Sequence, residues 1–329
     1  MTELTSNSIK SILVEIFETD KIMKLQLLTK LAVNTLYSFE VEGKRYVMKI
    51  LTRPVTVENE FYRLEKEAEL MRQFSVVKKA TGIPIKERSM VPVPEIFHIE
   101  SDTNKLGCKF IIMSKVQGEN LENIWIDLDS RKKEIFIEEF SKIVKNIHAV
   151  KFDMFGEIEE YRCPRRFYTY ASFLKANLRR TTRLLGTRTI IPTNLIMKAQ
   201  KFVEDNLDRV SYSSKPSLIH ADLNPSNVVI KDKKSMKISA ILDFEWSYAG
   251  DTLLELFDIQ EMWLLDEQLE QIFFDNYGIE IPNKNDVRKR IYKIMAYLNT
   301  ITYGWVYFHP TEENIERVIK CLKMNLGEE

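Results

Sequence analysis

The polar side chains best suited to chemistry lie in residues 218–251, which read LIHADLNPSNVVIKDKKSMKISAILDFEWSYAGD. His220, Asp222 and Asn227 follow the spacing His-x-Asp-x-x-x-x-Asn, and Asp243 follows the apolar run ISAIL. Carboxylate and amide oxygens are hard ligands of the kind that Mg²⁺ prefers. A carboxylate that is free of the metal can orient a hydroxyl and accept its proton. The stretch therefore predicts a metal site with a general base beside it.

The same stretch predicts a β-hairpin that brings two metal ligands together. Residues 226–231 and 237–243 resemble strands, and the polar segment KDKKSM supplies the turn. Antiparallel pairing about position 235 would place Asn227 opposite Asp243. Asp and Asn are also common in turns, which explains either residue alone better than it explains the set. His220 has no second His or Cys at ligand spacing, so we expect it to brace the loop by hydrogen bonding.

A lysine and a glutamate are expected in apolar surroundings. Lys49 shares a strand face with apolar residues, and Glu67 falls within the apolar stripe of a helix predicted over 57–74. An unpaired buried carboxylate is unfavourable, so it needs a cation. We predict a Lys49–Glu67 ion pair, with Glu60, one heptad earlier on the same face, as the competing partner. An ordinary salt bridge is the alternative explanation.

Strand-like segments come first along the chain and helical ones later. The expected strands are 35–41 and 45–51, joined by a tight turn at Glu42-Gly43, then 95–100 and 108–113, with one helix set among them over 57–74. The expected helices after residue 119 are 130–150, 166–186, 194–210, 253–277, 284–307 and 311–325. This order predicts an α+β fold with a β-rich N-terminal lobe, a short connector and a mainly helical C-terminal lobe.

Composition narrows the function classes. The 329 residues include 48 basic and 48 acidic side chains and are 44% hydrophobic, which predicts a folded protein without the basic excess typical of nucleic-acid binding. Three scattered cysteines favour a reducing compartment. No apolar run reaches the roughly 20 residues of a membrane helix. We therefore expect a cytoplasmic protein with neither nucleic-acid nor membrane partners; nothing in the sequence indicates its oligomeric state.

The segments described above, taken together, resemble the aminoglycoside phosphotransferase and choline kinase-like family, relatives of the protein kinases. The likeness rests on HxDxxxxN followed by Asp-hydrophobic-Glu, and extends through KRYVMKI, EKEAELMRQF, VPVPEIF, FIIMSKVQGENL and IVKNIHAVKFDMFGEI in the same order. The resemblance implies a bilobal protein-kinase-like fold in which Asp222 is the catalytic base. Asn227 and Asp243 would hold Mg²⁺.

The resemblance also implies a nucleotide site. Lys49 would contact the α- and β-phosphates of ATP or GTP, and Glu67 would hold Lys49 in place. Adenine would pair with the Ser114 carbonyl and the Val116 N–H. The lobes implied are a nucleotide-binding lobe at 1–113, a hinge at 114–118, and at 119–329 a helical lobe with the catalytic hairpin and the substrate site.

Two features depart from the family pattern. The expected phosphate loop, LTKLAVNTLYSF, contains no glycine, although Asn34 and Tyr37 match a looser N-x-x-Y spacing. Glu255 stands where the family often has a structural Asp. A protein kinase is disfavoured because DFEWS replaces DFG and no APE-like segment follows. A kinase-shaped binding protein without activity is the alternative from another class. The missing glycines favour it, and it is opposed by the intact Lys49, Asp222, Asn227 and Asp243.

The acidic residues after the hairpin bear on the substrate. The stretch between Lys237 and Lys284 has no basic residue and contains Asp243, Glu245, Asp251, Glu255, Asp258, Glu261, Asp266, Glu267, Glu270, Asp275 and Glu280. Such a wall would attract a cation, and Trp246, Tyr248 and Trp263 could stack on it. We expect an amino-bearing substrate of the aminoglycoside antibiotic type, contacted by Glu245, Trp246, Asp251 and Glu255. Choline, homoserine, methylthioribose and sugar kinases remain alternatives.

Overall fold

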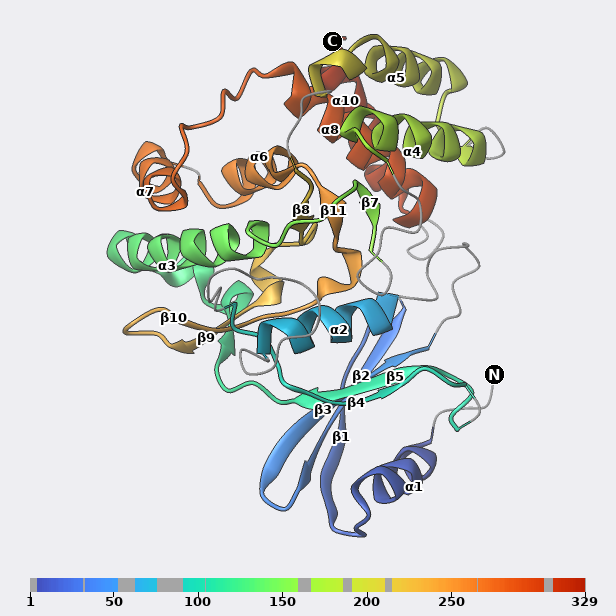
Figure 1. The fold of residues 1–329 in the computed structure, drawn as a ribbon, viewed down its shortest axis with the longest axis vertical. Coiled ribbons are helices and arrows are strands. Elements are labelled where there is room, and N and C mark those ends of the chain that lie inside the picture. Colours follow the sequence, from blue (N-terminus) through green and yellow to red (C-terminus); the bar gives the residue numbers. More distant parts are fainter. Residues whose placement is uncertain are drawn as a thin grey trace.

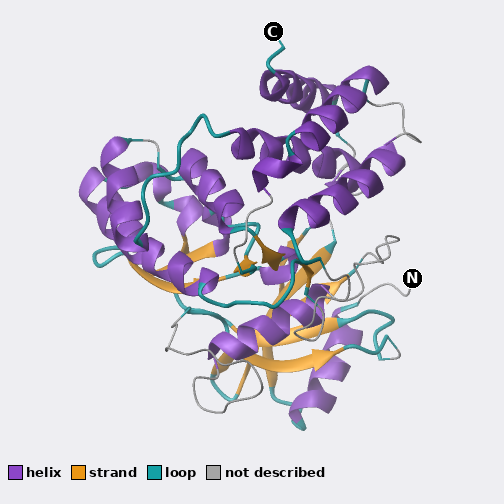
Figure 2. Cartoon of the chain, turned by 45° about the horizontal axis from the view of Figure 1, so that its top comes forward, coloured by secondary structure: helices purple, strands orange, loops and turns teal. Residues whose placement is uncertain are grey.

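The computed structural model shows a strand-rich N-terminal part and a helical C-terminal part, so the α+β architecture predicted from the sequence is confirmed (Figures 1 and 2). The structure describes residues 5–31, 33–52, 63–75, 91–103, 105–158, 167–185, 191–210, 215–264, 266–304 and 310–328. Among the helices in these ranges, none is long and apolar enough to cross a membrane.

The N-terminal part is a five-stranded antiparallel sheet in the order β1-β2-β3-β5-β4. Its strands are β1 (Ile22–Lys30), β2 (Asn34–Val41), β3 (Lys44–Leu51), β4 (Ile96–Glu100) and β5 (Phe110–Ser114). The predicted turn is present, and both Glu42 and Gly43 have positive φ, as a tight hairpin of this hand requires. Alternation along β5 sends Phe110 and Ile112 to one core and Ile111 and Met113 to another.

Helices cover both faces of this sheet. Helix α2 (Arg63–Ser75) lies between the sheet and the helical part (Figure 1). Helix α1 (Ser6–Phe17) packs Ile9 and Leu13 against the opposite face. The expectation of a single helix among the first hundred residues was therefore wrong. Since its buried residues share one helical face, the periodicity that marks α1 was present in the sequence.

The C-terminal part contains seven α-helices among the described residues and two small antiparallel sheets. The helices are α3 (Ser130–His148), α4 (Tyr170–Leu185), α5 (Thr193–Asp205), α6 (Thr252–Met262), α7 (Glu267–Tyr277), α8 (Val287–Asn299) and α10 (Glu312–Leu326). The sheets are β10-β9-β6 and β7-β11-β8, formed by β6 (Glu119–Asn120), β7 (Gly156–Glu157), β8 (Ser217–Ile219), β9 (Val228–Asp232), β10 (Lys237–Ile241) and β11 (Tyr248–Gly250). The helix expected over 253–277 is in fact two, because Asp266 caps a new helix by accepting from the Leu269 amide.

The predicted hairpin forms, but its register differs by one residue. The strands β9 and β10 are closed by the pair Asp232–Lys237, and the Asp232 carboxylate accepts from the Lys234 and Ser235 amides inside the turn. This four-residue turn shifts the centre of the hairpin, so Asn227 pairs with Leu242, whose amide donates to the Asn227 carbonyl at 2.8 Å. The pairing of Asn227 with Asp243 was wrong by one position, and the two residues remain near neighbours.

Candidate active site

Asp222 lies in the loop between β8 and β9, where side-chain amides orient its carboxylate. Asn224 donates to Asp222 Oδ1 at 2.7 Å and Asn227 donates to Asp222 Oδ2 at 2.9 Å. Ala221 before it has φ +67°, an unfavourable value for a residue with a Cβ. Burial raises the pKa of Asp222 to about 6, although the two amides oppose this shift. The carboxylate is thus held in place and is mostly ionised at neutral pH, so it can accept a proton.

His220 braces this loop. Its Nδ1 accepts from the Asp222 amide at 3.2 Å, so Nε2 carries the proton and donates to the Leu242 carbonyl at 3.0 Å. Its ring packs on Phe244, with the ring centres 4.4 Å apart. Burial lowers the pKa of His220, in keeping with a neutral ring. These contacts tie the loop that carries Asp222 to the strand that leads to Asp243.

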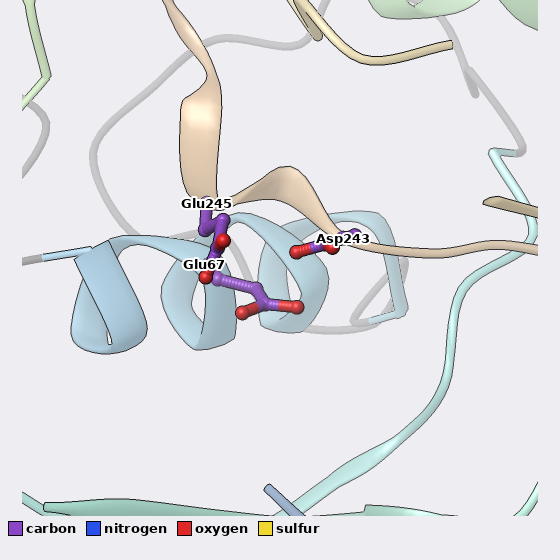
Figure 3. A group of neighbouring side chains, drawn as sticks. All are labelled: Glu67, Asp243 and Glu245. Carbon is purple, nitrogen blue, oxygen red and sulfur yellow. The ribbon is translucent and has the colours of Figure 1, made fainter. Parts of the chain in front are cut away.

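Lys49 is the centre of a buried charge cluster. The three acidic side chains of this cluster, Glu67, Asp243 and Glu245, are shown in Figure 3. Its ammonium lies 2.7 Å from Glu67 Oε2, 2.8 Å from Asp243 Oδ1 and 3.3 Å from Glu245 Oε2. The predicted Lys49–Glu67 contact is present, and Glu60 lies outside the described residues. Burial alone would lower the pKa of Lys49, but the three carboxylates raise it well above its ordinary value. The cluster therefore contains a protonated lysine.

Glu245 belongs to this charge cluster. It lies in a 3₁₀-helix, η5 (Phe244–Trp246), is only 6% exposed, and accepts from Asn34 Nδ2 at 3.0 Å. Carboxylate oxygens of Glu67, Asp243 and Glu245 lie within 4.8 Å of one another, close enough to share a cation. Asn34 begins β2 and lies within the glycine-free segment LTKLAVNTLYSF. Glu245 thus ties the first hairpin of the sheet to the residues that follow Asp243.

The other residues assigned to the substrate have internal roles or lie apart. Asp251 is 3% exposed; it caps α6 and accepts from the Tyr292 hydroxyl. Glu255 is 2% exposed and accepts from the Ala221 amide at 2.7 Å and from His148 Nε2 at 2.7 Å. The hydrogen bonds of Asp251 and Glu255 thus lie within the protein, while their predicted contact with a substrate stays a prediction. Trp246 is 40% exposed beneath the Arg63 guanidinium.

The acidic wall is largely neutralised by basic residues from beyond it. Asp258 and Glu261 both pair with Lys293, and Glu270 pairs with Lys284. Trp263, expected to stack on a ligand, is fully buried and donates to the Leu223 carbonyl. The linear count of eleven negative charges consequently overstates the charge that a ligand would meet.

The connector between the two parts is fixed by its backbone. Ser114 ends β5, where its amide donates to the Glu95 carbonyl at 2.8 Å, and Val116 follows in a partly buried segment without regular structure. Gly118 has φ +137°, and a Cβ there would lie 2.3 Å from the Ile230 carbonyl oxygen. Only glycine therefore lets the connector cross β9 this closely.

Three further residues complete this region and were not among those predicted from the sequence. Lys66 and Ser247 connect α2 to the loops, and His148 supports Glu255 from α3. Lys66 carried no usable signal, since a lysine on a helix is usually solvated. His148 stood at the end of an apolar helical face, where its burial could have been inferred.

Comparison with known proteins bears on the family and the fold of the chain. A profile of the phosphotransferase enzyme family matches residues 24–287, well over half of the chain. Aminoglycoside phosphotransferase APH(4)-Ia superimposes with a TM-score of 0.70 at 18% identity, covering 98% of this chain and 99% of that one. The gentamicin complex of APH(2")-IIa gives 0.67 at 15% identity, covering 98% and 97%. A putative fructosamine-3-kinase from Haemophilus somnus 129PT gives 0.66 at 17% identity, covering 97% of each chain.

A sequence search of curated proteins found no match. The solved structures are too distant in sequence to indicate more than the fold, whereas the profile match covers the sheet, the connector and both loops of the site. The chain therefore belongs to the phosphotransferase enzyme family and has its bilobal, kinase-like fold.

Proposed function

We propose that this protein transfers the γ-phosphate of ATP, or of GTP, to a hydroxyl of an amino-bearing small molecule. The observation that carries the proposal is the placement of Asp222. Its carboxylate is oriented by two amides, has a pKa of about 6, and makes none of the contacts to Lys49 that Asp243 makes. A general base needs this combination of fixed geometry and an available proton site.

The residues present suit Mg²⁺. The amide nitrogen of Asn227 is used by Asp222, which leaves the Asn227 oxygen for a cation, and Asp243 has a second oxygen beyond the one that contacts Lys49. The Asn227 and Asp243 oxygens are hard ligands, and both residues lie at the open end of the β9–β10 hairpin. Mg²⁺ held there would neutralise charge on the phosphates. The protein would supply Lys49, placed by Glu67, for the α- and β-phosphates, and Ser114 and Val116 backbone groups for adenine.

The proposed class of acceptor is supported by the comparisons with known proteins. The acidic residues between Lys237 and Lys284 do not support it, because several of them pair with lysines. The related structures include complexes of other proteins with hygromycin B, gentamicin and streptomycin, all in the same fold. The putative fructosamine-3-kinase has a comparable TM-score, so a sugar amine is the second candidate. An aminoglycoside-type antibiotic is the acceptor class we propose.

The test is transfer of labelled phosphate from ATP and GTP to a panel of aminoglycosides, sugar amines, choline, homoserine and neutral sugars. Asp222→Asn should lower the rate by about 10²–10⁴-fold and leave nucleotide affinity nearly unchanged. The matched control is Asp275→Asn, which changes an exposed carboxylate on α7. Transfer by Asp222→Asn within a few-fold of the control would remove Asp222 from the mechanism. Nucleotide binding with no transfer to any acceptor would favour a non-catalytic binding protein.

A further inference from the structure

Lys66 connects helix α2 to the C-terminal part independently of the Lys49 cluster. Its ammonium donates to the Ser247 carbonyl at 2.7 Å. Three residues earlier, the Arg63 guanidinium lies 3.5 Å from the centre of the Trp246 ring. Arg63, Lys66 and Glu67 stand at positions i, i+3 and i+4, so they share one face of the helix. That face contacts the short segment 243–247. Arg63 and Lys66 contact it directly, and Glu67 is linked to it through Lys49.

Ser247 carries this contact onward to the loop of the proposed base. It is fully buried, and its hydroxyl donates to the His220 carbonyl at 3.3 Å. The carbonyl of Ser247 thus binds α2, while its side chain binds the loop that contains Asp222. A displacement of α2 would therefore be transmitted through Ser247 to the loop that contains Asp222.

The surroundings of Lys66 favour this arrangement over a solvated lysine. Burial lowers the pKa of Lys66 to about 8, partly opposed by the carboxylates of Glu157, Glu245 and Glu67, while Arg63 lowers it further. The ammonium is therefore mostly protonated at neutral pH, and a charged donor makes a stronger hydrogen bond to a carbonyl than a neutral one.

We propose that Lys66 is a positioning residue: by binding the Ser247 carbonyl it holds α2 where Glu67 reaches Lys49, and it couples that helix to the Asp222 loop. This inference rests on the proposed function for its catalytic consequence. Its structural part stands separately, because the contact exists whether or not phosphate is transferred. The position of α2 would then be set within the fold, by the residues that directly follow Asp243.

The experiment compares Lys66→Met, Lys66→Arg and Arg72→Met in the full-length protein. Met keeps the apolar stem of Lys66 and removes the donor, Arg restores a cation, and Arg72 is a 41% exposed control on the same helix. We expect Lys66→Met to raise the nucleotide KM and to lower kcat, so that kcat/KM falls by about tenfold or more. Lys66→Arg should recover part of this loss. Assays run well below each Tm exclude simple unfolding.

Hydrogen exchange without nucleotide supplies a readout that does not depend on activity. Lys66→Met should speed exchange in α2 and also in 217–227, whereas Arg72→Met should change neither. Kinetics and exchange of Lys66→Met indistinguishable from those of Arg72→Met would overturn the inference, and faster exchange in α2 alone would overturn the coupling. If the wild type transfers no phosphate while exchange and nucleotide affinity respond as stated, the inference stands and the proposed function fails.

Discussion

Glu255 offers the sharpest test of how the fold supports the site. Its carboxylate is 2% exposed and accepts three hydrogen bonds, from the Ala221 amide at 2.7 Å, the His220 amide at 3.3 Å and His148 Nε2 at 2.7 Å. Burial alone would raise the pKa of Glu255, but the hydrogen bond and charge of His148 and the contacts of the loop hold it below its ordinary value. The group is therefore an anion with three donors directed at it.

Glu255→Gln keeps the shape and replaces one acceptor oxygen with a donor. The Ala221 amide uses Oε1, while the His220 amide and His148 both use Oε2. Whichever way the new amide turns, one or two buried donors lose their acceptor, at about 1–3 kcal/mol each. We expect the free energy of unfolding to fall by about 1–6 kcal/mol. Because Ala221 is held at positive φ beside this carboxylate, Asp222 should also shift and kcat should fall by about 10- to 100-fold.

The matched control is Glu261→Gln on the same helix. Glu261 is 45% exposed and pairs with Lys289 and Lys293 at the surface, so its loss should cost less than about 1 kcal/mol. Denaturant unfolding and phosphate transfer are measured on both variants. Equal unfolding free energies and equal kcat for the two variants would refute the role of Glu255 in holding the loop of Asp222. Glu255 would then again be a candidate for contact with the substrate.

Four further outcomes follow from the geometry. Asp243→Ala should weaken Mg²⁺–nucleotide binding as well as turnover, and an affinity that ignores Mg²⁺ concentration would argue against its role as ligand. Lys49→Met leaves three carboxylates clustered, so it should lose about 3–5 kcal/mol of stability at pH 7. Burial raises the pKa of Glu67, so lowering the pH neutralises this carboxyl and the loss should be smaller near pH 5; equal losses at both pH values would contradict this. A base must be deprotonated, so kcat/KM should rise with pH and level off above the pKa of Asp222, about 6; a rate falling from pH 5 to 7 would exclude it. Gly118→Ala should destabilise by at least about 2 kcal/mol more than Gly107→Ala, where a Cβ meets open space, and similar melting temperatures would contradict the close crossing.

The parts of the site that depend on local spacing were predictable. His220, Asp222 and Asn227 fall within one loop, whose length restricts how they can be arranged, and Asp243 follows a strand that can only return beside them. Lys49 and Glu67 were identifiable because each is a charged residue on an apolar face. Burying a charge without a partner is unfavourable, so two such residues of opposite charge are expected to form an ion pair. The hairpin register was predicted one residue away from the observed one, because the strand pattern alone did not indicate the four-residue turn in which Asp232 accepts from two amides.

The amino-acid sequence by itself determined the succession of a strand-rich part and a helical part, the residues of the central loop and the family to which the chain belongs; helix α1 and the division between α6 and α7 were not predicted from it. Tertiary structure alone decided which charges remain free. Asp251, Glu255 and Glu270 lie in one acidic stretch of the sequence, yet each contacts a residue outside that stretch. These partners are Tyr292, Ala221 and Lys284, respectively. Charge neutralisation is a property of distance in space, and distance along the chain carries little information about it.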